Sequence, residues 1–464
     1  MTSLLWLRQD LRLHDQPALA AAMEEGAVVP VYVLDDETPR EWRIGGAQRW
    51  WLHHSLRSLD DALKAKGSRL ILRRGRADQV LRDLADEVGA ERIHALRHYE
   101  PWWRNAAAAL GEGLCLHDGN HLAHIEDVRT GAGKPYRIYS AFWRALQPML
   151  PPDDPLPAPD AIPAPDRWPA SDELADWALL PTKPDWSTEF GPDWTPGEAE
   201  AQRKAAAFAE KVDAYEEHRN LPAEEGTSRL SPHLHFGEVS PRTVWGAVHG
   251  HPDAAKFHKE LAWRDFTSGL VLALPRYGEE NGRSAYNKMA WRDAPADLRA
   301  WQRGRTGYPI VDAGMRQLWA TGWMHNRVRM IAASFLVKHL LIDWREGERW
   351  FWDTLVDADY GNNAVNWQWV AGTGIDANMF GRIMAPLTQS EKFGAGDYIR
   401  RWVPELAGVP DPAIHDPEAA GCRPSDYPSK IIGHREARER ALAANARIMY
   451  PLAVIPRLCR RRGR

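Results

Sequence analysis

The sequence is poor in cysteine: Cys115, Cys422 and Cys459 are the only three in 464 residues. They form no CxxC pair, and an odd number of distant cysteines does not suit a disulfide framework, so the chain fits a reducing cytoplasm. A run of eighteen apolar residues is also missing, which argues against a membrane-spanning helix. The opening MTSLLWLRQDLRLHD shows no secretion signal. We therefore expect a cytoplasmic protein with no membrane partner.

An excess of positive charge is absent as well. The formal net charge is −4, so any site for a polyanion must be a local patch. No Walker loop, HExxH or GxSxG occurs. The histidines of HDGNHLAH (117–124) could bind a metal, but we interpret this segment as a solvated loop and expect no metal site.

Tryptophan, in contrast, is abundant, with 23 residues. A buried indole packs well but its N–H needs a partner, so proteins usually contain few. The stretch NNAVNWQWVAGTG places Trp367 and Trp369 two positions apart. A large core accounts for some of the rings, and others could carry electrons or stack on flat ligands.

The pattern of apolar residues divides the chain into three parts. Alternating strand and helix signals over 1–130 predict βαβ units, that is, an α/β Rossmann-like domain with a parallel sheet and helices on both faces. A stretch dense in proline predicts a linker over 131–197. Helical spacing predicts an all-helical domain over 198–464. The expected strands are 3–8, 27–34, 69–74, 92–97 and 113–118.

Two clusters in the helical part carry groups suited to ligands. In EGTSRLSPHLHFGEVS, hydroxyls lie beside free backbone N–H groups at a helix start, which suits phosphate. In KELAWRDF, Glu260 and Trp263 are three residues apart and share a helix face. Taken alone, an ordinary helix cap and a chance pair explain them equally well or better.

Two further clusters lie nearer the C-terminus. TGWMHNRVRM combines an amide, two cations and a thioether, although a solvated basic helix face is an equal alternative. DADYGNNAVNWQW places two acids and two asparagines beside tryptophan, which is unusual for a core. Asp357 is expected to pair with Arg329.

Together these segments resemble the DNA photolyases and cryptochromes over nearly the whole chain. The resemblance rests on LLWLRQDLRLHDQPAL, EGTSRLSPHLHFGE, WRDF, GRTGYPIVDAGMRQLWATGWMHNRVRM, DWREGER and NWQWVAGTG. IGGAQRWWLHHSL and HYEPWWRNA are most similar to the bacterial class III cyclobutane photolyases, which are close to plant cryptochromes.

The resemblance implies an FAD, bent into a U, in the helical domain. Asn363 is expected to face flavin N5. Trp367 would start a chain of electron-transferring tryptophans that continues through Trp344 and then Trp301 towards the surface. The implied cofactor-binding residues are Tyr215, Thr227, Ser228, Arg229, Leu230, Ser231, Trp323, Arg329, Asp357, Asp359 and Asn363.

The implied substrate is UV-damaged DNA. A pyrimidine dimer would flip into a cavity and accept an electron from light-excited, reduced FAD, which splits the cyclobutane ring. The implied substrate-binding residues are Trp263 and Trp369 as stacking walls, Glu260 and Asn326 at the base edges, Met330, and Arg264, Arg327 and Arg219 at phosphates. We also hypothesise that Glu260 is buried and partly protonated. We expect a monomer.

The family also carries an antenna pigment on the sheet domain. The class III resemblance favours a folate such as methenyltetrahydrofolate, near Trp50, Trp51, Glu100 or Trp103, while a deazaflavin or no antenna stays open. A cryptochrome without repair activity is the alternative function. Met330 favours cyclobutane repair, as does the short segment that follows RWVPELAG. A (6-4) photolyase is disfavoured because Asn326 and Met330 occupy the segment that should supply a histidine pair.

Overall fold

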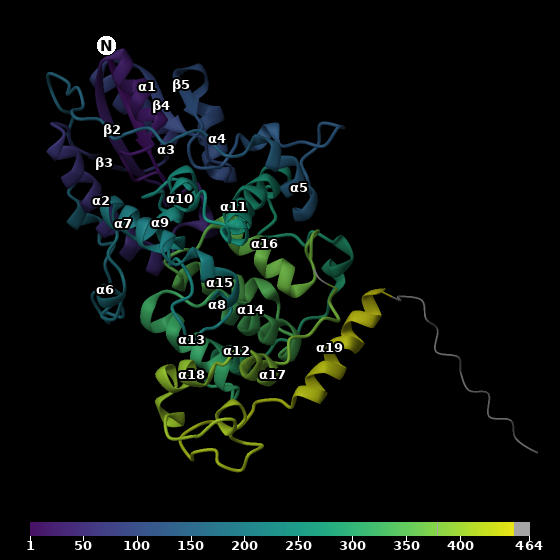
Figure 1. Cartoon of the computed structure of the whole chain (residues 1–464). Helices are drawn as coiled ribbons and strands as arrows, with labels where there is room; N and C mark the ends of the chain where they lie inside the picture. The colour runs from purple at the N-terminus through teal and green to yellow at the C-terminus, as the bar shows by residue number, and fades with distance from the viewer. Residues whose placement is uncertain (378, 450–464) are drawn as a thin grey trace, which may run out of the picture.

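The computed structural model describes residues 1–377 and 379–449; Cys459 lies outside them. A sheet with flanking helices forms one end of the molecule and a helical assembly forms the other (Figure 1). Within the described ranges, no helix has the length and apolar character needed to cross a bilayer.

The sheet has five parallel strands in the order β3-β2-β1-β4-β5. They are β1 (Thr2–Leu7), β2 (Ala27–Leu34), β3 (Ile71–Arg74), β4 (Ala90–Leu96) and β5 (Leu114–His117). The α/β prediction is confirmed, and each strand begins and ends within two residues of its expected limits.

Alternating side chains explain why helices cover both faces of the sheet. Leu5 and Leu7 of β1 pack with α1 (Pro17–Glu25) and α2 (Gly46–Ala65). Leu4 and Trp6 point the opposite way and pack with α3 (Ala77–Val88) and α4 (Pro101–Leu110).

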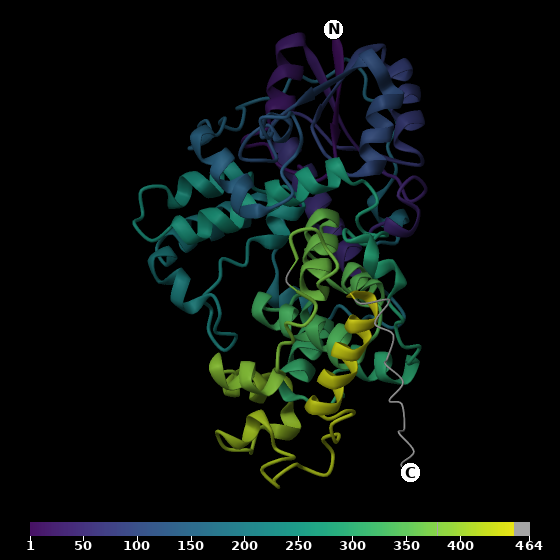
Figure 2. The same cartoon turned by 90° about the vertical axis from the view of Figure 1, so that its right-hand side faces the viewer.

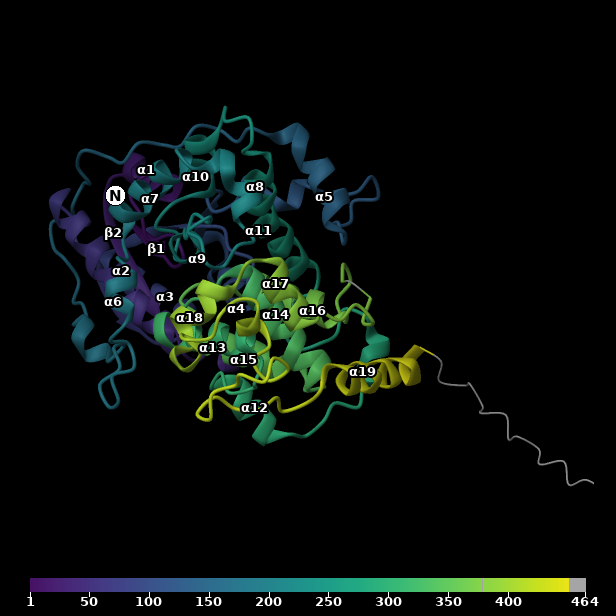
Figure 3. The same cartoon turned by 60° about the horizontal axis from the view of Figure 1, so that its bottom comes forward.

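The rest of the described chain is mainly helical; Figure 2 shows most of its helices beneath the sheet end, and Figure 3 shows helices beside the sheet as well. The helices are α5 (Tyr139–Leu146), α6 (Phe190–Asp193), α7 (Glu198–Ala209), α8 (Tyr215–His218), α9 (Ser231–His235), α10 (Pro241–Val248), α11 (Ala255–Ala273), α12 (Pro295–Gln302), α13 (Pro309–Thr321), α14 (Asn326–Ser334), α15 (Trp344–Thr354), α16 (Tyr360–Ala371), α17 (Pro386–Lys392), α18 (Gly396–Trp402) and α19 (His434–Met449). The proline-rich segment lies on the folded surface, with Trp177 and Trp194 each 3% exposed. The boundaries at 130 and 197 stay predictions.

A buried arginine ties the sheet domain to the helical part. Arg12, 1% exposed, donates to Asn120 Oδ1 (2.8 Å) and to the carbonyl oxygen of Gly237 (3.0 Å). The backbone N–H of Leu13 donates to Glu198 Oε2 (2.8 Å). The hydrogen-bond donors of the segment after β1 therefore find partners in residues more than a hundred positions away in sequence.

The segment 117–124 packs against α11. Asp265 Oδ2 accepts the backbone N–H of Leu122 (2.8 Å), and His121 Nε2 lies 3.0 Å from Ser268 Oγ. The prediction of a solvated loop is wrong because α11 covers the segment. Burial raises the pKa of Asp265 to about 7.

This raised pKa gives a testable pH dependence. A carboxyl whose pKa rises on folding contributes stability below its unfolded value of 3.8, and that contribution is lost as pH approaches about 7. We expect the wild type to lose roughly 2 kcal/mol of unfolding free energy between pH 5 and 8 relative to Asp265→Asn, which has no charge to bury. Urea denaturation at several pH values measures it, and parallel curves for the two proteins would contradict it.

Candidate functional site

A buried ion pair lies at the centre of the helical part. The Arg329 guanidinium on α14 donates to both carboxylate oxygens of Asp357 (3.0 and 2.8 Å), while its Nε donates to the Met324 carbonyl (2.7 Å). The Asp357 side chain is only 3% exposed. The predicted pairing is confirmed, and its two parallel bonds hold the carboxylate in one orientation.

Arginine and tryptophan side chains meet at the start of α9. Arg229 has a left-handed backbone (φ +50°), and its guanidinium carbon lies 4.4 Å from the centre of the Trp194 ring and 5.0 Å from that of Trp323. Trp323 Nε1 donates to Ser231 Oγ (3.4 Å). The structure therefore brings together three residues predicted to hold the cofactor.

The remaining predicted cofactor residues differ from one another in burial and in their contacts. Thr227 and Ser228 are half-buried, whereas Leu230 is in the hydrophobic core. Tyr215 is 8% exposed and packs against neighbouring aromatic rings. Asp359 caps α16, since its Oδ1 accepts the backbone N–H of Asn362 (2.7 Å). Their roles stay predictions.

Several buried nitrogen atoms near these residues have no hydrogen-bond partner among the described residues: Arg229 Nε, Arg264 Nη1, His235 Nδ1 and His325 Nε2. Burial lowers the pKa of both histidines to about 4, so both rings are neutral at pH 7. Because His325 Nδ1 accepts the N–H of Arg327 (3.2 Å), its Nε2 carries the proton and is a free donor. Conversely, His235 Nε2 faces Gln48 Oε1 (3.1 Å), so its Nδ1 is a free acceptor.

Such a set of cationic donors, a neutral donor and an acceptor fits a polar, anionic ligand such as a dinucleotide. Arg264 belongs to it, because its Nη2 donates to the Leu234 carbonyl (3.2 Å) and its Nη1 is buried. Arg264 as a whole is half-buried, and its predicted contact with a DNA phosphate stays a prediction. The sequence offered no signal for the buried Nη1, since an arginine beside Trp263 fits a surface role equally well.

Asn363 lies inside the same region, 8% exposed, and donates to the backbone oxygen of Glu348 (3.1 Å). The Glu348 side chain is 1% exposed, and neither carboxylate oxygen has a partner in the described part of the chain. Burial raises the pKa of Glu348 well above its ordinary value. Sequence reasoning missed this carboxyl because Glu348 belongs to the charged stretch DWREGER and fits a solvated helix face.

The three predicted electron-transfer tryptophans are all buried. Trp367 is 3% exposed, and Trp344 and Trp301 are 0% exposed. The Trp301 ring centre lies 6.3 Å from that of Trp367, and its Nε1 donates to the Ala332 carbonyl (3.0 Å). The prediction that Trp301 leads to the surface is wrong: it lies beside the first ring, in the core.

Trp367 itself depends on a close approach to α15. A methyl group at Gly347 would lie 2.1 Å from the Trp367 ring, so no larger residue fits at this position. Trp344 Nε1 donates to Asn281 Oδ1 (2.9 Å), and the Arg345 guanidinium lies 4.5 Å from the Trp344 ring. Each ring is thus fixed by a specific neighbour.

The predicted stacking walls, Trp263 on α11 and Trp369 on α16, are both half-buried. Glu260, one turn before Trp263, has a side chain 37% exposed, bonded to Arg219 and 3.4 Å from Lys256 Nζ. The hypothesis that Glu260 is buried is therefore wrong, because its side chain is partly exposed and lies beside two cations.

The predicted substrate residues of α14 lie near Arg219. Asn326 is exposed at the first position of the helix. Arg327 Nη2 donates to Asn220 Oδ1 (2.6 Å), and its Nη1 lies 3.7 Å from Met330 Sδ. Since Asn220 follows Arg219 in the chain, the side chains of Arg219, Asn220, Arg327 and Met330 form one group.

The rings predicted near an antenna lie in different environments. Trp50 and Trp51 are 5% and 0% exposed, and Trp51 Nε1 donates to Glu238 Oε1 (3.0 Å). Both are core residues, and the predicted pigment site near them stays a prediction. Trp103 is half-buried, with its ring centre 4.8 Å from that of His98. Burial raises the pKa of Glu100, the residue before α4, to about 8.

Comparison with known proteins gives consistent matches. The model of the FAD binding domain of DNA photolyase matches residues 257–447, and the DNA photolyase model matches residues 3–160. A deoxyribodipyrimidine photo-lyase of Agrobacterium fabrum is 48% identical over 96% of this chain and 98% of its own length. A class III photolyase structure from Agrobacterium tumefaciens superimposes with a TM-score of 0.92 at 47% identity, over 97% of this chain and 98% of that one. An archaeal photolyase from Sulfolobus tokodaii, solved with two FAD molecules, superimposes with a TM-score of 0.83 at 31% identity, over 96% and 99%.

Proposed function

The chain belongs to the DNA photolyase/cryptochrome family, and from that premise we propose that it is a deoxyribodipyrimidine photo-lyase, a light-driven enzyme that splits cyclobutane pyrimidine dimers in DNA. The observation that carries the proposal is the pair of half-buried tryptophans, Trp263 and Trp369, on helices that also border the polar ligand site. A flavin site alone would need no such walls.

FAD is held by the residues that have free polar atoms around α9. Arg229 and Arg264 supply positive charge for its diphosphate, and His325 supplies a neutral donor. When bound, reduced FAD would lend the dimer an electron in light and take it back once the cyclobutane ring has split, so that repair changes no net oxidation state. Asn363 is oriented by the Glu348 carbonyl, which takes its amide N–H and leaves its Oδ1 as an acceptor.

The dimer reaches Trp263 and Trp369 by flipping out of the duplex, where a damaged pair costs less to open than an intact one. Trp263 and Trp369 stack on its flat faces, and stacking needs no particular base. Glu260 accepts hydrogen bonds from base edges. Arg219, only 12% exposed and bonded to Glu260, acts as a positioning residue. One chain supplies every one of these groups, which supports our proposal of a monomer.

A light-harvesting second cofactor belongs on the sheet domain, near Trp103 and Glu100. These residues follow β4, and the order of the strands reverses between β1 and β4, where α/β sheets bind ligands. The neighbour solved with two FAD molecules supports a second pigment of this kind. A folate is our proposed pigment, and an absorption band beyond that of flavin, restored by adding folate to stripped protein, would test it.

The decisive experiment illuminates reduced, flavin-loaded protein with a thymine-dimer oligonucleotide. We expect the ultraviolet absorbance of thymine to recover in near-UV or blue light and to stay constant in a dark control. A protein that binds and photoreduces flavin but restores no thymine would instead be a cryptochrome, and the proposal of repair would be abandoned.

A further inference from the structure

A basic surface segment lies next to the stacking wall, outside the cofactor site and the dimer cavity. Residues 129–144, called the basic arm here, contain Arg129, Lys134, Arg137 and Arg144 and no carboxylate. All four side chains are exposed. In a chain of net charge −4, sixteen successive residues with four cations and no acid form a local field of one sign.

The basic arm has a fixed backbone. The N–H of Thr130 donates to the Lys134 carbonyl (2.9 Å), the N–H of Gly133 donates to the Thr130 carbonyl (2.8 Å), and Arg129 pairs with Pro135 in an antiparallel bridge. The turn therefore presents Lys134 and Arg137 from a closed loop, so little ordering entropy opposes their contact with a ligand.

The four cations are available to an anion. Among the residues that the structure describes, no carboxylate pairs with any of them, although many arginines elsewhere form such pairs. Arg129 donates to the carbonyls of Glu126 and Gly133, and Arg144 to that of Ser140 (3.3 Å). These carbonyl bonds orient the guanidinium groups and leave their charge uncompensated.

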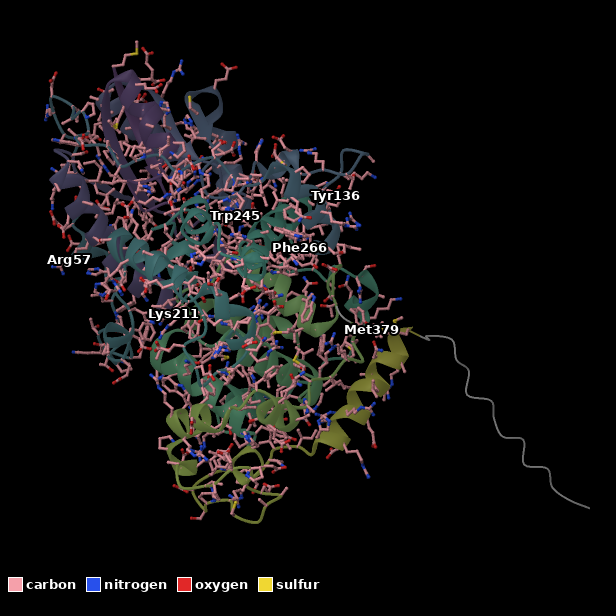
Figure 4. All side chains as sticks on the ribbon, in the orientation of Figure 1. Arg57, Tyr136, Lys211, Trp245, Phe266 and Met379 are labelled. Carbon is pink, nitrogen blue, oxygen red and sulfur yellow. The ribbon has the colours of Figure 1, made fainter. Side chains whose placement is uncertain are left out.

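Tyr139 joins the basic arm to the stacking wall. Its ring centre lies 4.6 Å from that of Trp263, its hydroxyl donates to the Lys259 carbonyl, and its N–H donates to Asp376 Oδ2 (2.8 Å). Asp376 lies in the segment after α16, which carries Trp369. Figure 4 places Tyr136 at the outer edge of the molecule and Phe266, which also contacts the Tyr139 ring, further inside.

We propose that the basic arm binds the DNA backbone beside the lesion, with Lys134 and Arg137 on phosphates of the strand that passes Trp263. The inference rests on the proposed repair function. Duplex DNA is the polyanion that must reach Trp263, and the arm is fixed to that ring by Tyr139. An acidic protein partner would have no reason to lie against the stacking wall.

The test compares Lys134→Ala/Arg137→Ala with wild type in binding to a dimer-containing duplex and an undamaged duplex over a range of salt concentrations. We expect affinity for both duplexes to fall on the order of tenfold near physiological salt. The slope of log K against log salt should become shallower by about 1.8, or about 0.9 for each phosphate that the variant no longer neutralises. Flavin content and light-driven repair at saturating DNA should not change, because neither residue touches the cofactor site.

Arg435→Ala/Arg438→Ala is the matched control. It removes the same charge from α19, which Figures 1 and 3 place away from α5, so its salt slope should equal that of wild type. Lys134→Arg/Arg137→Lys should retain full binding. If the wild type repairs dimers and the alanine variant keeps the same affinity and salt slope, the inference about the basic arm is overturned and the proposed function stands. A wild type that binds DNA without repair would instead overturn the proposed function.

Discussion

Replacing Asp357 with alanine will yield a protein without flavin and lower its free energy of unfolding by about 3 kcal/mol. The carboxylate is 3% exposed and takes two bonds from Arg329, whose side chain is 23% exposed. Removing one partner of a buried pair leaves the other charge uncompensated, which typically costs about 3–5 kcal/mol. The partial exposure of Arg329 places the expected loss at the lower end.

Two measurements check this result: the ratio of flavin to protein absorbance after purification, and the urea midpoint. Asp397→Ala is the control, since Asp397 is 84% exposed and also pairs with an arginine; we expect less than about 0.5 kcal/mol there. Asp357→Asn keeps the shape and tests the charge alone. If the Asp357→Ala protein still contains a full complement of flavin, Asp357 is not part of the cofactor site.

Trp263→Ala will separate recognition of the lesion from binding to the backbone. Stacking contributes about 1–3 kcal/mol per base, and the dimer presents two bases, so affinity for a dimer-containing duplex should fall on the order of a hundredfold. Affinity for undamaged duplex should change little, because backbone phosphates supply most of that binding. Trp263→Phe retains a flat ring and should recover part of the loss.

Fluorescence anisotropy with matched damaged and undamaged duplexes measures this difference. Trp319→Ala is a suitable control, because Trp319 on α13 is 52% exposed and stacks on Trp350 of α15. Equal losses on the two duplexes would mean that Trp263 supports the fold around α11 instead of the lesion.

The sequence allowed the sheet and the Arg329–Asp357 pair to be predicted. The strands are apolar runs bounded by helical segments, and the acids of DADYGNN lie in a polar cluster that suits pairing with an arginine of TGWMHNRVRM. The predictions for Trp301 and Glu260 were wrong because neither the resemblance, which placed Trp301, nor helical spacing, which placed Glu260 beside Trp263, shows whether another helix covers a side chain. Trp301 is covered, and Glu260 is open.

Glu348 and the segment 117–124 also show that the sequence does not reveal burial, here for polar residues that the fold covers. The segment 117–124 was interpreted as a solvated loop, and Glu348, in the charged stretch DWREGER, carried no prediction. Glu348 is enclosed with no partner for its carboxylate among the described residues, and the segment is held by Asp265 from α11. Whether a polar group is buried depends on how elements distant in the sequence pack together, and composition does not show that packing.

The bonds of Arg12 also constrain how the protein is made. During synthesis the sheet residues leave the ribosome first, but Gly237, Glu198 and Asp265, which complete the bonds of Arg12, Leu13 and Leu122, are translated later. At ordinary elongation rates this delay is on the order of ten seconds. Until then the nascent sheet has unsatisfied donors at the surface that later meets the helices, so it should remain open to chaperones and proteases. In a fragment that ends near residue 130, these donors should stay without their partners.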